Sequence, residues 1–149
     1  MGRPGLDRIS RSLRWWKKQL NADFVVVNGE NASVVGMTPD QGEEIFDAGA
    51  DVITMGNHTF KKREIVPYLE DNSRVLRPAN LAPQLPGSGV GVYETKFGPV
   101  AVIDLIGRCN MDYHAENPFL MVDKLRTQLD TKLILVELHA EATSEKLAM

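Results

Sequence analysis

Residues 23–58 have the sequence DFVVVNGENASVVGMTPDQGEEIFDAGADVITMGNH, and this stretch decides the fold class. Two apolar, β-prone runs, residues 23–27 and 51–55, lie on either side of a segment that begins like a helix. Thr38 and Gln41 have the spacing of a helix N-cap and its capping box. The ends of the two runs are 28 residues apart, close to the roughly 30 residues of a βαβ unit. The stretch therefore predicts two parallel strands joined by a right-handed helical crossover.

The rest of the chain predicts further elements of an α/β domain. Helices are expected where apolar residues recur every three or four positions, and strands where short β-prone runs lie between turn residues. The expected helices cover residues 6–20, 61–69 and 119–129, with another beginning near Thr143. The expected strands are residues 75–76, a β-hairpin over 90–105 and a last strand over 132–138. In the first helix, the apolar face is expected to comprise Leu6, Ile9, Leu13, Trp16 and Leu20.

Three polar clusters follow predicted strands. They are NGEN at residues 28–31, GNH at residues 56–58 and HAE at residues 139–141. If the three strands are parallel members of one sheet, the clusters meet at its carboxyl edge, where open α/β sheets bind ligands. The clusters combine a carboxylate, carboxamides and imidazoles, a mixed set that suits Mn²⁺, Fe or Zn²⁺ better than Ca²⁺. We therefore expect a metal site at this edge.

Each candidate residue also has an ordinary structural interpretation. Glu30 could bridge two cations or be a solvated loop carboxylate. Asn57 could offer its carbonyl oxygen to a metal beside His58 as a general acid, or the pair could be a helix N-cap and a surface histidine. His139 could be a ligand or a buried, hydrogen-bonded imidazole. Glu141 could orient His139 or be a solvated carboxylate.

Composition bounds the class of protein. The chain has 149 residues, of which 43% are hydrophobic and 25% charged, as is typical of a single globular domain. Its one cysteine, Cys109, excludes an internal disulfide and a Cys-rich zinc framework, and favours a cytoplasmic protein. The sequence has no P-loop, no glycine-rich dinucleotide fingerprint and no G-x-S-x-G motif.

Charge is distributed unevenly along the chain. Residues 1–20 carry a net charge of +5, whereas the remaining residues carry −8. The basic segment is interpreted first as a solvated helix face, and the alternative is a surface for nucleic acid or a membrane. We expect no membrane partner and keep RNA as a partner to test.

Five motifs spread along the chain are shared with one known family. They are GRPG at residues 2–5, NGEN at 28–31, ITMGNHT at 53–59, RPAN at 77–80 and HAEATSEK at 139–146. On these motifs the chain resembles the calcineurin-like metallophosphoesterases, and specifically the YmdB-type branch. The resemblance implies an α/β metallophosphoesterase sandwich, truncated, with parallel βαβ units and a β-hairpin. It also implies hydrolysis of cyclic nucleotides or related phosphodiesters.

The resemblance assigns roles to five residues. Glu30 would bridge two divalent metal ions, expected to be Mn or Fe, with Mg or Zn as alternatives. Asn57 and His139 would ligate the second ion, and Asn31 would lie beside the first. His58 would be the catalytic residue that acts on the substrate phosphate or the leaving group. The metal pair would generate a hydroxide and bind the phosphoryl oxygens.

The sequence departs from the family pattern in two places. The family has a strand ending in a metal-binding Gly-Asp before the GRPG segment and a Thr-His-Thr-His stretch farther on, and residues 1–149 contain neither. We therefore expect residues 1–149 to be one metallophosphoesterase domain, incomplete at both ends and impaired or inactive. Unpaired strand edges would lower its stability and favour a homo-oligomer. The alternative is a non-catalytic nucleotide- or RNA-binding module with a vestigial metal site.

Overall fold

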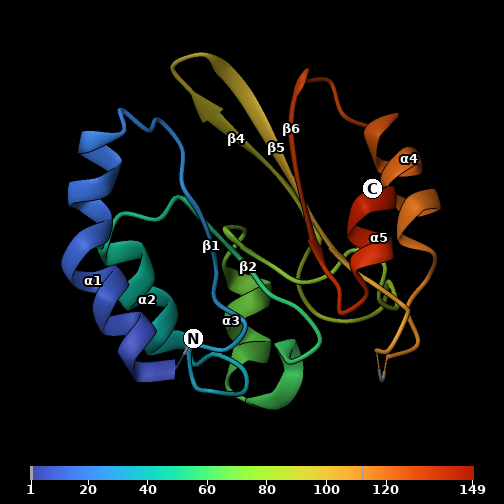
Figure 1. The fold of residues 1–149 in the computed structure, drawn as a ribbon, viewed down its shortest axis with the longest axis horizontal. Coiled ribbons are helices and arrows are strands. Elements are labelled where there is room, and N and C mark those ends of the chain that lie inside the picture. The colour runs from blue at the N-terminus through green and yellow to red at the C-terminus, as the bar shows by residue number, and fades with distance from the viewer. Residues whose placement is uncertain (1, 112) are drawn as a thin grey trace.

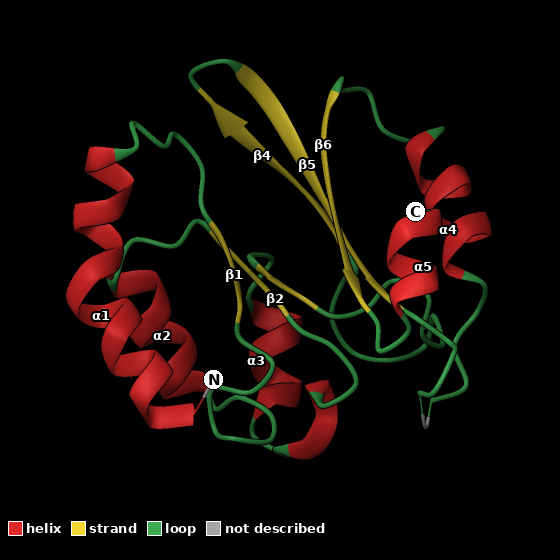
Figure 2. Ribbon diagram, in the orientation of Figure 1, coloured by secondary structure: helices red, strands yellow, loops and turns green. Residues whose placement is uncertain are grey.

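The computed structural model describes residues 2–111 and 113–149 as four layers, helices–sheet–sheet–helices (Figure 1). The helices are α1 (Gly2–Gln19), α2 (Pro39–Asp47), α3 (Ile65–Asp71), α4 (Pro118–Arg126) and α5 (Thr143–Ala148), with a 3₁₀ turn η1 (Thr59–Lys61). The strands are β1 (Val26–Asn28), β2 (Val52–Thr54), β3 (Val75–Leu76), β4 (Val90–Thr95), β5 (Gly98–Ile106) and β6 (Leu133–His139). Helices α1 and α2 cover one side of the molecule, and α4 and α5 cover the other (Figure 2).

The six strands form two three-stranded sheets, in the orders β1-β2-β3 and β4-β5-β6. Strands β1, β2 and β3 are parallel, with Val27 opposite Ile53, so the predicted βαβ unit is confirmed. Strands β4 and β5 form the predicted antiparallel hairpin, and β6 pairs in parallel with β5. The observed fold is therefore the α/β sandwich expected from the sequence, with a parallel βαβ unit and a β-hairpin.

The expectation that all three motif-bearing strands share one sheet is wrong. Strand β6 takes its backbone partners from β5 along its whole length, from Leu133 opposite Val100 to His139 opposite Ile106. Its contact with β1 is made through side chains, since Asn28 donates a hydrogen bond to Glu137 at 2.7 Å. The carboxyl ends of β1, β2 and β6 nevertheless converge, because the two sheets pack face to face.

Two clusters of buried residues hold the layers together. The larger lies between the helices and the first sheet and includes Leu6, Ile45, Ile53 and Ile65. The smaller, formed by Val52, Leu76 and Val102, lies between the two sheets. Alternate residues of β2 therefore serve different cores, which is the period-two pattern of a strand covered on both faces.

The start of α2 follows the sequence prediction. The hydroxyl of Thr38 accepts from the backbone N–H of Gln41, and the side chain of Gln41 accepts from the backbone N–H of Thr38. This capping box satisfies two N–H groups that the first helical turn leaves without partners. Gly49, at φ +112°, then turns the chain into β2.

Helix α1 is amphipathic over only part of its length. Leu6 is fully buried, and Ile9 and Leu13 pack against the same core, as predicted. Trp16 and Leu20 are 42% and 69% exposed, so their assignment to the apolar face is wrong. Beyond Leu13 the helix meets polar groups of the α2–β2 connection instead of an apolar surface. None of the described helices is both long enough and apolar enough to cross a membrane.

Candidate functional site

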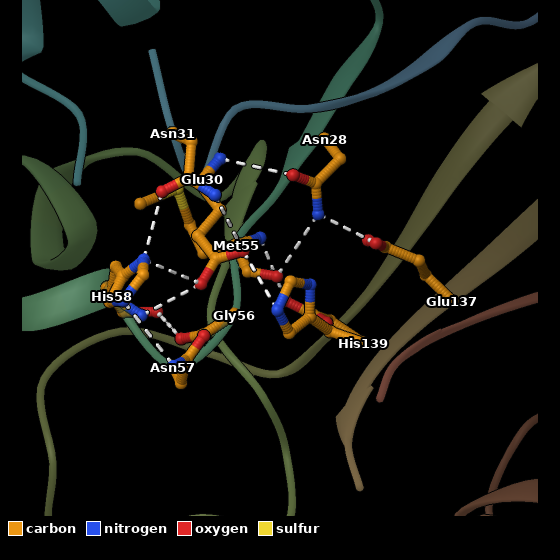
Figure 3. Close-up of polar contacts among 11 residues, drawn as sticks. Asn28, Glu30, Asn31, Met55, Gly56, Asn57, His58, Glu137 and His139 are labelled. Atoms are coloured by element: carbon orange, nitrogen blue, oxygen red, sulfur yellow. Dashed lines mark hydrogen bonds and ion pairs between the residues drawn. The ribbon is translucent and has the colours of Figure 1, made fainter. Parts of the chain in front are cut away.

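The carboxyl ends of β1, β2 and β6 place five polar side chains around one point (Figure 3). Glu30 and Asn31 follow β1, Asn57 and His58 follow β2, and His139 is the last residue of β6. These are the five residues that the sequence singled out as the site. The structure brings all of them together.

Glu30 is the centre of this group. Its side chain is fully buried, yet each carboxylate oxygen contacts a different imidazole. Oε1 lies 3.3 Å from Nδ1 of His58 and accepts the backbone N–H of the same residue at 3.0 Å. Oε2 lies 3.0 Å from Nε2 of His139. One carboxylate therefore links residues from both sheets.

Gly56 is required by this arrangement. A Cβ atom at this position would lie 2.7 Å from Cδ of Glu30 and 2.8 Å from both carboxylate oxygens. Any side chain would displace the carboxylate, because carbon atoms in proteins do not approach so closely. The glycine of the GNH motif thus forms one wall of the Glu30 site.

The ionisation of Glu30 and His139 is set by burial and by their contact. Burial opposes ionisation of Glu30, but the hydrogen bond and charge of His139, together with His58, lower its pKa below the usual value. The hydrogen bond to Glu30 raises the pKa of His139, against the opposing effect of burial. The contact therefore favours a carboxylate beside an imidazolium.

The two carboxamides lie beside His58. Oδ1 of Asn31 is 2.9 Å from Nδ1 of His58, and Nδ2 of Asn57 is 3.5 Å from its Nε2. Asn31 also donates weakly to Oε2 of Glu30, at 3.5 Å. His58 is 29% exposed and His139 is 25% exposed, so both rings remain accessible to solvent beside a buried carboxylate.

The chemistry of the group fits a metal centre, although its ligands are not arranged as one in this structure. Within residues 2–111 and 113–149, no three His, Cys, Asp or Glu side chains form a ligand group for an ion. The imidazoles of His58 and His139 contact the Glu30 carboxylate directly. A buried carboxylate with an accessible imidazole at each oxygen, flanked by carboxamides, is nonetheless a mixed N/O donor set. The chemistry of these side chains therefore fits the metal centre that the sequence implied.

A second polar layer, which the sequence reasoning missed, lies between the sheets beneath this site. It consists of Asn28, Thr54, Asp104 and Glu137. Asp104 is fully buried, and its Oδ2 accepts the backbone N–H of Met55 at 2.9 Å. Oγ1 of Thr54, Oδ1 of Asp104 and Oε2 of Glu137 are buried without a hydrogen-bond partner among the described residues.

Burial dominates the electrostatics of this layer. It raises the pKa of Asp104 well above the usual value, and the neighbouring charge of Glu137 raises it further. Burial also raises the pKa of Glu137. Asp104 and Glu137 lie opposite each other on β5 and β6 and point to the same face. A carboxylate in each of two otherwise apolar strand runs was the sequence signal for this pair.

The C-terminal motif contributes a different carboxylate from the one expected. Glu141, suggested as a partner of His139, is exposed, and the hydrogen bond of His139 goes to Glu30. Glu145 is buried instead and accepts the backbone N–H groups of Arg108 and Cys109 at 2.9 and 3.1 Å. Glu145 therefore holds the loop after β5 against α5.

Comparison with known proteins agrees with these motifs. A family model described as YmdB-like protein matches residues 1–149. The chain belongs to the YmdB-like family. Among curated members, the chain is 38% identical to the 2′,3′-cyclic-nucleotide 2′-phosphodiesterase of Bacillus subtilis, over 100% of this chain and 57% of that protein. It is 31% identical to a putative phosphatase/phosphodiesterase of Mycoplasma pneumoniae, over 97% of this chain and 54% of that protein.

Solved structures give the same fold. A hypothetical protein from Thermus thermophilus superimposes with a TM-score of 0.92 at 34% identity, over 99% of this chain and 57% of that one. A novel phosphatase from Mycoplasma pneumoniae superimposes with a TM-score of 0.90 at 32% identity, over 99% of this chain and 54% of that one. The YmdB-like chain therefore spans about half the length of the relatives that it matches.

Proposed function

We propose that this chain carries part of the active site of a metal-dependent phosphodiesterase that acts on cyclic nucleotides or related phosphodiesters. The observation that carries the proposal is the buried carboxylate of Glu30, each of whose oxygens meets an imidazole from a different strand end. The names of the relatives, a cyclic-nucleotide phosphodiesterase and a phosphatase/phosphodiesterase, support the same chemistry.

Four side chains are proposed as ligands of a dinuclear centre. Glu30 would bridge the two ions, Asn57 and His139 would hold the second, and Asn31 would lie at the first. Mn or Fe suits these donors best, with Mg or Zn as alternatives. When bound, such a pair supplies a nucleophilic hydroxide and charge stabilisation for the phosphoryl oxygens.

His58 is proposed as the catalytic residue. Its Nδ1 is held by Oδ1 of Asn31 and lies near Oε1 of Glu30, which fixes the ring orientation. Nε2 is then the ring atom that can exchange a proton with a substrate phosphate or leaving group. The ring is accessible to solvent, as this role requires.

The donor set within this chain is short for two metal ions. Two ions with tetrahedral surroundings need about eight donors, and the proposed protein ligands number four. We therefore expect the 149-residue chain to bind metal weakly and to hydrolyse phosphodiesters slowly or not at all. We also propose one partial domain in the cytoplasm, where an exposed free thiol such as Cys109 is stable.

Hydrolysis of 2′,3′-cyclic AMP and of bis(p-nitrophenyl) phosphate, with millimolar Mn²⁺, tests the proposal. Any turnover should be slow, absent without metal, and abolished in His58→Ala and Glu30→Gln. The exposed Glu141→Gln variant is the matched control and should keep the wild-type rate. Metal-independent hydrolysis, or equal loss in Glu141→Gln, would contradict the assignment.

The second candidate is a non-catalytic nucleotide-binding module. The direct contacts between Glu30 and both imidazoles favour it, since a group satisfied in this way needs no metal. Calorimetry with a cyclic nucleotide in the presence of a chelator separates the two. Nucleotide binding that is unchanged by metal removal, without any turnover when metal is restored, supports the module.

A further inference from the structure

The six basic residues of α1 fall into two sets. Three are held against the body of the protein, where Arg3 pairs with Glu44, Arg14 donates to the carbonyl of Asp47 and Lys17 pairs with Asp51. The other three are Arg8, Arg11 and Lys18. They are exposed, and no ion pair found among residues 2–111 and 113–149 involves them.

The three exposed basic residues form a stripe along α1 that also includes Trp15. Arg8, Arg11, Trp15 and Lys18 are spaced three, four and three residues apart, so they share one face of the helix. At 1.5 Å per residue, Arg8 and Lys18 are about 15 Å apart along the axis. This face is opposite the one that packs Leu6 into the core.

Trp15 presents an accessible ring on this face of α1. It is 54% exposed, and its ring meets that of Trp16 edge-on, with centroids 4.6 Å apart and an angle of 78° between the planes. In an edge-on contact at least one face of each ring stays free of the other ring, so Trp15 can stack on another planar group.

We propose that this face of α1, defined by Arg8, Arg11, Trp15 and Lys18, binds single-stranded nucleic acid. Three exposed cations in a row match successive phosphates of a flexible strand, and Trp15 offers a stacking surface for a base. Residues 21–149 carry a net charge of −8, so a polyanion is attracted to the basic α1 segment and repelled by the rest of the chain.

A membrane surface fits the same face less well. Helices that bind at the lipid interface insert a broad apolar face beneath a basic one. In α1 that apolar face is already occupied, because Leu6, Ile9 and Leu13 pack in the core. The cations flank Trp15 along the helix, which is the arrangement expected of a surface that follows a nucleic-acid strand.

The start of α1 is fixed beside the residues that follow β1. The backbone N–H of Gly2, the first residue of the helix, donates to the carbonyl of Asn31 at 2.6 Å. The stripe from Arg8 to Lys18 lies farther along the helix, on its outer face. Binding at α1 does not require catalysis, so the two proposals can fail separately.

Fluorescence anisotropy with a labelled twelve-nucleotide oligothymidylate tests this inference. A DNA probe is used so that hydrolysis of RNA cannot be confused with weak binding. The test variant is Arg8→Gln/Arg11→Gln/Lys18→Gln, and we expect it to lose at least tenfold in affinity. The control is Lys124→Gln/Arg126→Gln/Lys132→Gln, which removes the same charge from exposed positions and should bind like wild type.

Salt and stacking give two further readouts. Three phosphate contacts predict that raising salt from 50 to 200 mM weakens wild-type binding about 20-fold, with a smaller effect in the α1 variant. Trp15→Ala should lose at least fivefold in affinity, whereas Trp15→Phe should keep most of it. Equal affinities of the two triple variants would overturn the proposal. So would binding to anionic phosphatidylserine vesicles without binding to the oligonucleotide.

Discussion

Oε2 of Glu30 lies 3.0 Å from Nε2 of His139, and this contact joins the two sheets at their carboxyl edge. Glu30 follows a strand of the first sheet, and His139 ends a strand of the second. The site therefore depends on how the sheets pack, and substitutions that disturb the interface between the sheets should alter its geometry.

Replacing Gly56 by alanine should disrupt the site more than the fold. The new Cβ would lie 2.7 Å from the Glu30 carboxylate, so the carboxylate must move away from its imidazole partners. We expect a loss of about 1–3 kcal/mol in the free energy of unfolding, measured by urea denaturation, because overpacking of a buried site costs that much. Metal-dependent hydrolysis should fall below detection. A variant with wild-type stability and activity would show that the Glu30 carboxylate is not fixed against Gly56.

Asp104→Asn should stabilise the protein at neutral pH. The raised pKa of Asp104 means that the folded state favours its protonated form. Its contribution to stability is therefore greatest below the unfolded pKa of about 3.9 and declines as pH rises from there towards the folded pKa. Asparagine keeps an acceptor for the N–H of Met55 and cannot ionise, so the unfolded state no longer gains free energy by losing a proton. We expect a gain of about 1–3 kcal/mol at pH 8 by urea denaturation.

The gain in Asp104→Asn should shrink at pH 4.5, because ionisation of the carboxyl favours the unfolded state much less there than at pH 8. Asp104→Leu is the comparison variant, because it removes the charge together with the acceptor for Met55. It should be less stable than Asp104→Asn at both pH values. An equal gain in Asp104→Asn at pH 4.5 and pH 8 would exclude ionisation as the cause.

The contribution of Tyr93 to stability should depend on pH above pH 10. Burial raises its pKa to about 12, and its hydroxyl donates to the carbonyl of Ser73 at 2.8 Å. Because the folded state favours the protonated phenol, this contribution is complete below pH 10 and is lost as pH rises from 10 to 12. Between pH 10 and 12, the free energy of unfolding measured by urea denaturation should fall for wild type. For Tyr93→Phe the fall should be smaller by up to about 2 kcal/mol. Parallel pH profiles for the two proteins would contradict the assignment.

Local signals in the sequence predicted most of the fold. Thr38 and Gln41 fixed the start of α2, and the spacing of the apolar runs fixed the parallel crossover. These features depend on residues close together in the chain, so spacing alone can find them. The five candidate site residues were proposed in the same way, since each lies at or just beyond a predicted strand end, and the structure brings them together (Figure 3).

The features that the sequence did not predict arise from pairing between distant segments. Strand β6 could pair with either β1 or β5, and its apolar pattern does not distinguish between them. The Asp104–Glu137 pair becomes visible only once the register of β5 and β6 is known. The exposure of Trp16 likewise depends on where α1 runs beyond its apolar contacts. Periodicity identifies elements, whereas their neighbours are set by packing.

Equilibrium dialysis against Mn²⁺ tests the central claim most directly, because removing a carboxylate shared by two ions should abolish the binding of both. We predict that wild-type protein binds two Mn²⁺ per chain at millimolar metal and that Glu30→Gln, folded by circular dichroism, loses both together. Exposed Glu141→Gln should retain both. If Glu30→Gln bound as much Mn²⁺ as wild type, Glu30 would not be the residue around which this site is built.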